Sequence, residues 1–152
     1  MKPMGVNRVT IAVEDLQKGI EVFSMLLGAT FHSANEEDAA RFGIEVAMSW
    51  DAGIELVAPL PDRDSHVKQF LKDRGEGLMG VIFAVDDVEE AKEAALSLGA
   101  QIWHSLDYTR QEIDEHLQGR FKKYKEYMLS PQGTCGVAPV IGQIEPSEGG
   151  QS

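Results

Sequence analysis

The sequence contains little cysteine, a minority of basic residues and no long apolar run. One of its 152 residues is cysteine, Cys135, which excludes an internal disulfide and a zinc site built from cysteines. The 14 Lys and Arg residues against 25 Asp and Glu give a net charge of −11, which argues against nucleic acid and anionic membrane surfaces as partners. No apolar run approaches the ~20 residues of a membrane span, and no apolar signal core follows the first residues. We therefore expect a cytoplasmic protein that binds neither nucleic acids nor membranes.

The apolar residues that are present, 43% of the chain, suffice for a core. Alternation and β-branched residues predict strands over residues 9–13, 30–32, 43–50, 54–58, 78–85, 101–103, 124–130 and 137–141. Apolar residues at helical spacing predict helices over 16–27, 66–74 and 88–98. Asp15 is expected to cap the first helix and Gly28 to end it. Residues 35–40 are predicted to form a loop or a single helical turn, and residues 145–152 a disordered tail.

Two parts of the chain repeat one another. Residues 84–88 (AVDDV) match residues 12–16 (AVEDL) at an offset of 72, and residues 98–100 (LGA) match residues 27–29 (LGA). The predicted elements then follow in the same order, βαβββ, in both parts. Because neither part is large enough to bury its sheet alone, the sequence predicts an α+β fold in which tandem βαβββ modules form one curved mixed sheet with a concave pocket.

The predicted arrangement is a single domain over residues 1–144 with one insertion. Its two halves are expected at about 6–60 and 78–143, and an inserted helix at about 107–119. This helix begins with a capping box, Thr109-Arg110-Gln111-Glu112. Two interpretations stay open for it: a surface helix packed on one edge, and a lid over the mouth of the pocket.

Five stretches of the chain carry a family resemblance: residues 11–16 (IAVEDL), 26–28 (LLG), 54–60 (IELVAPL), 70–78 (FLKDRGEGL) and 83–91 (FAVDDVEEA). They resemble the vicinal oxygen chelate superfamily, which has the glyoxalase and bleomycin-resistance fold. Within it, the sequence is most similar to the methylmalonyl-CoA epimerase family. The resemblance covers residues 6–103 well and residues 123–143 loosely. It implies the fold directly, whereas the same fold hosts many chemistries.

The resemblance also implies a divalent metal in the pocket, which would stabilise an enolate formed beside a carbonyl. The four positions that hold the metal in the family fall here on Arg8, Glu55, Gly80 and Val140, although the repeat symmetry would instead pair Glu55 with Cys135. Among the four, glycine and valine have no ligand atom and arginine stays protonated. We therefore expect neither a metal site nor a cofactor.

Arg8 and Glu55 are the residues that carry the functional hypothesis. Both are expected to point into the pocket, at the place that the metal would occupy. The guanidinium could pair with Glu55 or receive a ligand carboxylate or enolate in a bidentate way. In an enzyme, Glu55 would act as the catalytic base and Arg8 as the oxyanion partner. The alternative is an ion pair that only fills a degenerate pocket.

Further candidate ligand contacts are predicted in the second half, at Gly80, Trp103, His104, Tyr108 and Val140. A lid helix would bring Tyr108 or His116 to the ligand. Basic residues also gather between 120 and 125 in an otherwise acidic chain. They fit a solvated strand edge, or a contact to phosphate such as that of a coenzyme A thioester.

The sequence therefore favours a metal-independent protein that binds a small organic ligand, with acidic molecules and acyl-CoA thioesters as candidates. A second hypothesis is an epimerase, isomerase or lyase that acts next to a carbonyl. A third is a noncatalytic domain that binds a partner. A homodimer is left open, because members of the resembled family are often dimers.

Overall fold

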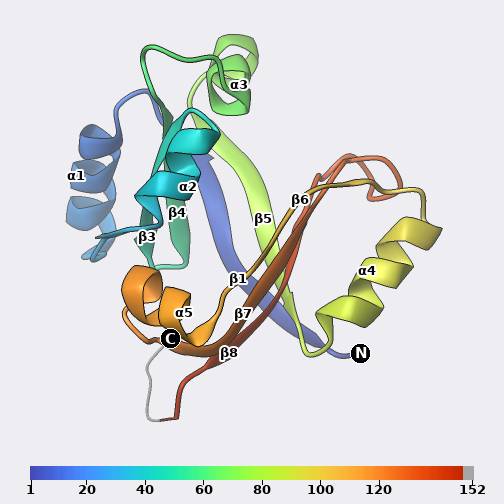
Figure 1. The fold of residues 1–152 in the computed structure, drawn as a ribbon. Coiled ribbons are helices and arrows are strands. Elements are labelled where there is room, and N and C mark those ends of the chain that lie inside the picture. The colour runs from blue at the N-terminus through green and yellow to red at the C-terminus, as the bar shows by residue number, and fades with distance from the viewer. Residues whose placement is uncertain (149–152) are drawn as a thin grey trace. The chain divides into compact units, whose positions relative to one another are not determined.

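The computed structural model describes residues 1–148, and the chain divides into two compact units (Figure 1). The first unit is Arg8–Met79, and the second combines Met1–Asn7 with the chain from Gly80 onward. The order of elements confirms the predicted α+β class with its repeated modules. Strand β1 (Pro3–Ala12) contributes to both units, since the unit boundary falls inside it. Among the described residues, no helix is both long and apolar enough to cross a membrane.

The first unit contains three helices and three strands besides β1. They are α1 (Leu16–Leu27), β2 (His32–Ser33), α2 (Glu36–Arg41), β3 (Ile44–Ser49), β4 (Ile54–Pro59) and α3 (His66–Arg74). The strands lie in the order β2-β3-β4-β1; β1 is parallel to β4, and the other pairs are antiparallel. The polar segment at 35–40 forms α2 because the Asn35 side chain accepts a hydrogen bond from the Asp38 amide at 3.2 Å and caps the helix.

Helix α1 covers one face of this sheet. The Asp15 side chain caps it and Gly28, with φ of 67°, ends it, as the sequence predicts. Gly19 permits a close approach to the sheet, because a Cβ there would lie 3.2 Å from a methyl group of Val13. The side chains between helix and sheet form an apolar cluster that includes Leu16, Ile20, Phe23, Val13, Ile54, Leu56 and Ala58.

Helices α2 and α3 supply side chains to the opposite face of the same sheet. A second apolar cluster forms there, with Ala39, Val67 and Leu71 from the helices and Ala12, Ile44 and Val57 from the strands. The two clusters use alternate residues of β1 and β4, since successive side chains of a strand point to opposite faces. The sequence therefore specifies two different faces for one short sheet.

The second unit repeats the plan with an added helix. Its elements are β5 (Gly77–Val85), α4 (Val88–Ser97), β6 (Ile102–Asp107), α5 (Arg110–Leu117), β7 (Phe121–Leu129) and β8 (Val140–Pro146). The strand order is β1-β5-β8-β7-β6. Helix α4 packs on one face, where Val88, Ala91 and Ala95 meet Tyr127, Leu129 and Ile141.

The inserted helix, α5, is a packed part of this unit. Its capping box forms between Thr109 and Glu112, as predicted. Ile113 is only 1% exposed, and Tyr108, just before the helix, stacks on Tyr124 of β7 with ring centroids 5.5 Å apart. Tyr124 and Tyr127 point to opposite faces of β7, so α5 and α4 cover opposite sides of this strand. The burial supports the interpretation of a packed surface helix.

The last strand lies further along the chain than the sequence predicts. It was expected at 137–141, whereas β8 begins at Val140 because the preceding turns include left-handed residues at Cys135 and Ala138. The strand continues through residues 145 and 146, which were expected in the tail, because it pairs with β7 as far as Pro146. The predicted tail residues 149–152 lie outside the described residues.

Candidate functional site

Arg8 and Glu55 form a buried ion pair in the first unit. They come from the neighbouring parallel strands β1 and β4, and Arg8 Nε donates to Glu55 Oε2 at 2.7 Å. The side chains are 4% and 17% exposed. The Arg8 guanidinium also lies 5.5 Å from the ring centroid of Trp50, which follows β3. The two residues that the sequence singles out are thus in direct contact.

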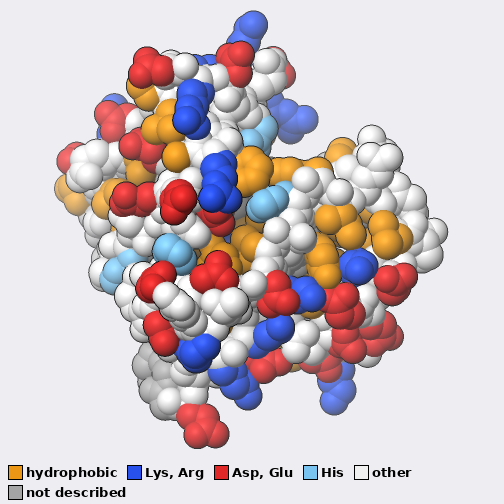
Figure 2. Space-filling view, viewed as in Figure 1, with side chains coloured by type: hydrophobic (Ala, Val, Ile, Leu, Met, Phe, Trp, Pro, Cys, Tyr) orange, Lys and Arg blue, Asp and Glu red, His pale blue; other side chains and the backbone are white. Residues whose placement is uncertain are grey.

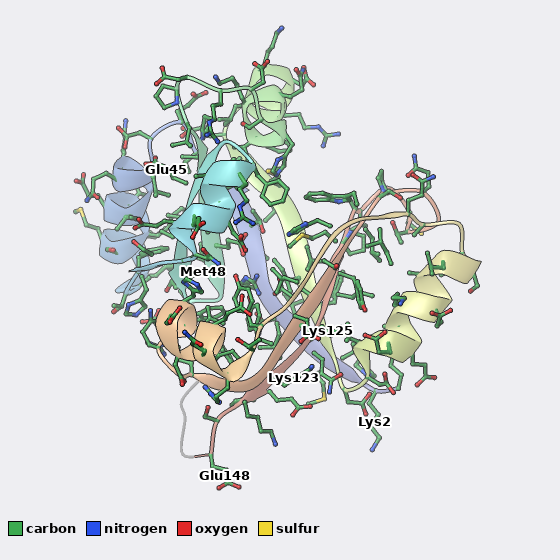
Figure 3. The ribbon with its side chains drawn as sticks, viewed as in Figure 1. Lys2, Glu45, Met48, Lys123, Lys125 and Glu148 are labelled. Atoms are coloured by element: carbon green, nitrogen blue, oxygen red, sulfur yellow. The ribbon has the colours of Figure 1, made fainter. Side chains whose placement is uncertain are left out.

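The pair lies on the sheet face opposite α1. Arg8 shares its face of β1 with Ala12, and Glu55 shares its face of β4 with Val57, two residues of the α2–α3 cluster. On β3, Met48 pairs with Glu55 and is also buried (Figure 3). On this face Arg8 is buried and Glu55 is partly buried.

Burial makes this pair energetically demanding. Removing two charges from water costs several kcal/mol per ion, and only close pairing with good hydrogen bonding compensates for that cost. Arg8 has further interactions besides the bond to Glu55. Such a pair is a weak source of net stability, yet losing one partner leaves the other charged and buried. In this arrangement Arg8 and Glu55 stay close together where solvent has little access.

The strand register identifies the counterpart of Glu55 in the second unit. Glu55 pairs with Thr10 of β1, and Ile82, 72 positions after Thr10, pairs with Val140 of β8. Val140 is therefore the counterpart of Glu55, as the family resemblance implies. The alternative, Cys135, is wrong, because this exposed residue lies in the turns before β8.

Four of the five candidates in the second unit share one sheet face. Val140 is directly opposite Met128 of β7, and His104 of β6 is opposite the same residue. Tyr108 stacks on Tyr124, which lies on the same face of β7 as Met128, four residues before it. Gly80 lies two residues before Ile82, the partner of Val140.

Trp103 departs from this pattern. The pairing of β6 with β7 shifts between Ile102 and His104, so Trp103 occupies an irregularity where strand alternation breaks. Its side chain is 53% exposed, and its ring centroid lies 6.1 Å from that of His104. Sequence alternation alone could not have placed it.

Glu126 of β7 is a buried carboxylate that the sequence analysis missed. It is 1% exposed and lies opposite Gly142 of β8, on the face that carries Met128 and Val140. A Cβ at Gly142 would come within 3.2 Å of Glu126 Cγ, so the glycine makes room for the glutamate. From the neighbouring lysines, the sequence predicts a solvated segment here. Strand alternation along β7 could have revealed Glu126, since it places Glu126 on the face opposite Lys123 and Lys125.

Lys123 and Lys125 of β7, which are labelled in Figure 3, each pair with a carboxylate. Lys125 lies 2.6 Å from Glu89 of α4, and Lys123 lies 3.1 Å from Asp107. Tyr127 also donates to Glu89 at 2.7 Å. The hydrogen bonds from Lys125 and then Tyr127 lower the pKa of Glu89 to about 2, and the bond to Glu89 raises the pKa of Lys125.

Acidic and basic side chains are accordingly intermixed around α4 in the space-filling view (Figure 2). Lys122 also approaches a carboxylate, Glu145, at 3.7 Å. Because their charge is balanced locally, these lysines are poorly suited to a phosphate site. They do not lie on a strand edge as expected either, because β7 is paired with β6 on one side and β8 on the other.

The side chains at the metal positions implied by the resemblance do not fit a metal. Arg8 carries positive charge, Gly80 and Val140 offer no side-chain donor, and Glu55 is a single carboxylate. Within residues 1–148, no three His, Cys, Asp or Glu side chains gather in a way that could hold an ion. The donor set is therefore unlike that of a metal centre.

Comparison with known proteins relates this site to one superfamily. The sequence profile described as the Glyoxalase/Bleomycin resistance protein/Dioxygenase superfamily matches residues 7–115, more than half of the chain. No curated protein sequence is significantly similar to it.

Solved structures share its fold at low sequence identity. A methylmalonyl-CoA epimerase from Mycobacterium tuberculosis is 26% identical, covers 95% of this chain and 89% of its own, and has a TM-score of 0.67. A methylmalonyl-CoA epimerase in complex with methylmalonyl-CoA and NH4+ is 18% identical over 95% and 100% of the two chains, with a TM-score of 0.72. A variant of the Streptomyces coelicolor enzyme in complex with 2-nitronate-propionyl-CoA is 19% identical over 96% and 100%, also at 0.72. By its profile match and its fold, the chain belongs to the glyoxalase/bleomycin resistance protein/dioxygenase superfamily.

Proposed function

We propose that this protein binds a small acidic organic ligand, with acyl-CoA thioesters as the leading class, and that it does so without a metal ion. The observation that carries the proposal is the buried pair of Arg8 and Glu55, 2.7 Å apart at two positions where the family resemblance implies metal ligands. A guanidinium supplies fixed positive charge and a planar set of donors, which match a carboxylate or an enolate oxygen.

The ligand class is supported by the structural relatives. Two of these epimerase structures contain acyl-CoA compounds, methylmalonyl-CoA and 2-nitronate-propionyl-CoA. Methylmalonyl-CoA has a free carboxylate beside its thioester, so a buried arginine is a suitable partner for either group. The ligand would displace part of the bonding between Arg8 and Glu55, which makes its affinity depend on both residues.

Calorimetric titration tests this proposal. Protein treated with a chelator is titrated with methylmalonyl-CoA, propionyl-CoA and free coenzyme A, with and without added Co²⁺. We expect methylmalonyl-CoA to bind and the added ion to leave its affinity unchanged. Binding that vanishes on chelation and returns with the ion would contradict the metal-independent mode.

The matched variants separate the role of the pair from general stability. The double substitution R8M/E55M removes both charges together and leaves no unpaired buried ion, so the protein is expected to fold. Its affinity for methylmalonyl-CoA should fall roughly tenfold or more, since a hydrogen bond to a charged group is lost. The control, E89Q/K125M, removes an ion pair of the second unit on the face covered by α4. It should bind as the wild type does.

A catalytic alternative is favoured by the proximity of a carboxylate to a cation. Glu55 would take the proton from the carbon next to the thioester carbonyl, and the C–H electron pair would move to the carbonyl oxygen. Arg8 would stabilise that oxyanion by hydrogen bonding. The proton held by Glu55 would exchange with solvent, and a solvent-derived proton returned from Glu55 to carbon would regenerate the thioester, so the cycle needs no oxidant or other reactant.

Deuterium exchange distinguishes this alternative from binding alone. Wild-type protein and propionyl-CoA are incubated in D2O, and the label at the α-carbon is followed by mass spectrometry. A catalyst incorporates deuterium and E55Q does not, whereas a binding protein gives the background rate in both cases. An E55Q variant that exchanges as fast as the wild type would exclude Glu55 as the base.

The candidates of the second unit remain proposed ligand contacts. Among them, His104→Ala and Tyr108→Phe are expected to weaken methylmalonyl-CoA binding, whereas the exposed Trp103 can be tested by its fluorescence on titration. Gly80 and Val140 provide shape and no charge. Light scattering would decide between a monomer and the homodimer that the sequence leaves open, and fractionation would test the predicted cytoplasmic location.

A further inference from the structure

Trp50, directly after β3, lies against the buried guanidinium of Arg8. The Arg8 Cζ atom is over the Trp50 ring, 5.5 Å from the ring centroid. Arg8 is 4% exposed, and its Nε donates to Glu55 at 2.7 Å. Two groups of the first unit therefore act on this guanidinium, a carboxylate at Nε and an aromatic ring at Cζ.

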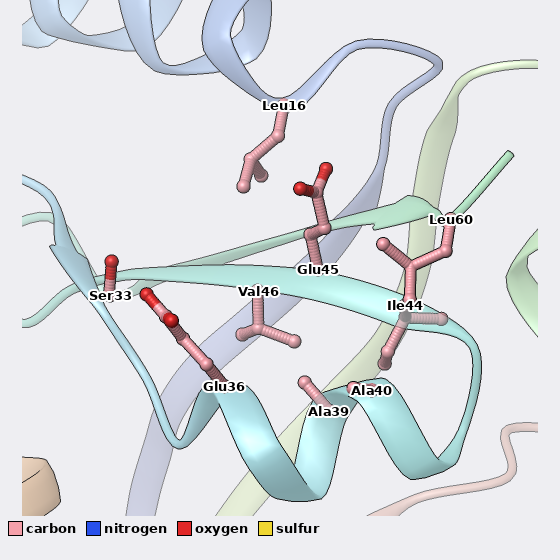
Figure 4. A pocket seen from close by; sticks show the side chains of 9 residues that line it. All are labelled: Leu16, Ser33, Glu36, Ala39, Ala40, Ile44, Glu45, Val46 and Leu60. Atoms are coloured by element: carbon pink, nitrogen blue, oxygen red, sulfur yellow. The ribbon is translucent and has the colours of Figure 1, made fainter.

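Strand alternation brings Trp50 to the sheet face of the ion pair. In the close view of β3 and α2 (Figure 4), Val46 is directed toward α2 and Glu45 toward the other side of the strand. Val46 lines the hollow drawn there, and Trp50 is not part of its wall. Met48 shares the face of Val46 and pairs with Glu55 of β4. Trp50 follows two residues later, just past the end of the strand, and continues this row.

Hydrogen bonds on both sides of Trp50 hold the turn that carries it. The hydroxyl of Ser49, a residue that is 1% exposed, donates to Asp51 and accepts from the Ala52 amide at 3.3 Å. Asp51 accepts from the Thr30 amide at 3.2 Å, which joins the turn to the segment after α1. The hydrogen bond from Ser49 lowers the pKa of Asp51, so this carboxylate remains an acceptor. The ring is therefore attached to a backbone that is fixed on both sides.

A ring in this place limits the freedom of the arginine. Aromatic rings attract cations through their quadrupole, and the attraction is larger where solvent is excluded. An arginine side chain has many rotamers, and ordering it when a ligand binds weakens the binding. With Trp50 at Cζ and Glu55 at Nε, this ordering has already taken place in the ligand-free protein.

We propose that Trp50 is a positioning residue of the anion site at Arg8. Its ring keeps the guanidinium beside Glu55, in the place where it receives the carboxylate or enolate oxygen of the ligand. The inference rests on the proposed function, because it assigns to Trp50 the preorganisation of that same site. Trp50 acts on the ligand through Arg8.

Hydrogen exchange at Arg8 Nε tests the position of the guanidinium without any ligand. In 15N-labelled protein the Nε–H signal is identified by its absence in R8M/E55M, and its exchange with water is followed by NMR. W50L should exchange roughly fivefold or more faster than the wild type, because leucine is apolar but has no ring. W50Y keeps a ring and should stay within about twofold of the wild type. Exchange in W50L at the wild-type rate would overturn the inference.

Calorimetric titration with methylmalonyl-CoA extends the test to the ligand. W50L should bind roughly fivefold or more weakly than the wild type, and W50Y within about twofold. If the wild type does not bind, the proposed function fails, and the exchange rates alone decide the role of Trp50. If the wild type binds and W50L binds equally well, the inference about Trp50 fails while the proposed function stands.

Two further variants separate the ring from its surroundings. Ser49→Ala loosens the turn and should also weaken binding, but S49A/W50L should bind no more weakly than W50L, because the turn acts through the ring. Strictly additive losses would contradict this role. The control, Arg74→Met, removes another contact of an arginine with a ring, 5.8 Å from Phe70 in the same unit, and should change neither exchange nor affinity. If R74M changes both as much as W50L does, the effect is not specific to Arg8 and the inference is refuted.

Discussion

The two units share an order of elements and a strand register, yet they carry different polar residues at corresponding positions. In the first unit Arg8 and Glu55 form a buried ion pair, whereas Gly80 and Val140 occupy the corresponding places in the second. The second unit has its buried glutamate, Glu126, on another strand. The difference teaches that apolar alternation preserves the sheet while the chemistry on its face changes independently in each half.

A second pair of counterparts makes the same point. Val46 lies opposite Val57 in the first unit, and Glu126 lies opposite Gly142 in the second. These pairs correspond, because the strand neighbours of Val57 and Gly142 on β1 and β5 are 72 residues apart. The first unit therefore has two facing valines at this position. The second unit has a glutamate, Glu126, facing a glycine, Gly142.

The largest effect is expected from breaking the ion pair in one unit only. Arg8→Met leaves the Glu55 carboxylate buried and should lower the free energy of unfolding by roughly 3–5 kcal/mol. Val140→Ala, at the counterpart of Glu55, removes two methyl groups from a partly exposed site and should cost about 1 kcal/mol. Urea unfolding of both variants measures the contrast.

The double variant R8M/E55M is the control for that comparison, and it should recover most of the stability that R8M loses. Equal losses for R8M and V140A would mean that Arg8 and Glu55 are not a buried pair in solution.

The next effect tests the valine and glycine counterparts. Gly142→Val adds a side chain whose Cβ alone would lie 3.2 Å from Glu126 Cγ, so it should cost about 1–3 kcal/mol by overpacking. Adding Glu126→Val recreates the valine pair of the first unit and should relieve the crowding. A thermal double-mutant cycle measures the coupling between the two sites. Strictly additive losses would contradict the correspondence.

A smaller effect is expected from the Glu89 ion pair, which is specific to the second unit. Lys125 and Tyr127 lower the folded-state pKa of Glu89 to about 2, from 4.5. A lowered pKa gives stability that is present above pH 4.5 and is lost as the pH falls toward 2. Because Glu89 is half exposed, solvent weakens this term, and exposed pairs contribute about 0.2–1 kcal/mol.

Melting temperatures of wild type and E89Q between pH 2 and 6 test this sign. The wild type should lose stability more steeply in that window, and the two curves should converge at its acidic end. Parallel curves would show that the bond to Lys125 does not persist in solution.

The smallest effect is expected on the outer face of α1. Met25 is 88% exposed and Leu26 is 69% exposed, so Met25→Glu should change the free energy of unfolding by no more than about 0.5 kcal/mol. On α4, by contrast, a charged side chain, Glu93, is 73% exposed. A loss above 1 kcal/mol in M25E, measured by urea unfolding, would mean that α1 is covered in solution.

Local signals predicted most of the fold. The cap at Asp15, the stop at Gly28 and the capping box at Thr109 are short-range patterns, and each forms as expected. The order of elements followed from the repeat. The start of β8 did not, because two of the left-handed residues before it, Cys135 and Ala138, are not glycine and give no sequence signal for that conformation.

The candidate site was predictable only in part. Arg8 and Glu55 were identified because the resemblance fixed their strand positions, and the parallel register brings them together. Glu126 was not, since its burial depends on the absence of a side chain at Gly142, a residue of another strand. Contacts of this kind are long-range and leave no periodic trace in the sequence.

Strand β1 has a practical consequence for constructing fusions. Its residues 3–7 belong to the second unit, the Met1 ammonium lies 2.9 Å from Glu90 of α4, and the Lys2 amide donates to Asp86. An N-terminal affinity tag would therefore disturb a region encoded 84 to 89 codons downstream, and cutting the gene after Met79 would separate the later fragment from a strand segment that belongs to its unit. A fragment that begins at Gly80 should therefore fold better when residues 1–7 are added to it.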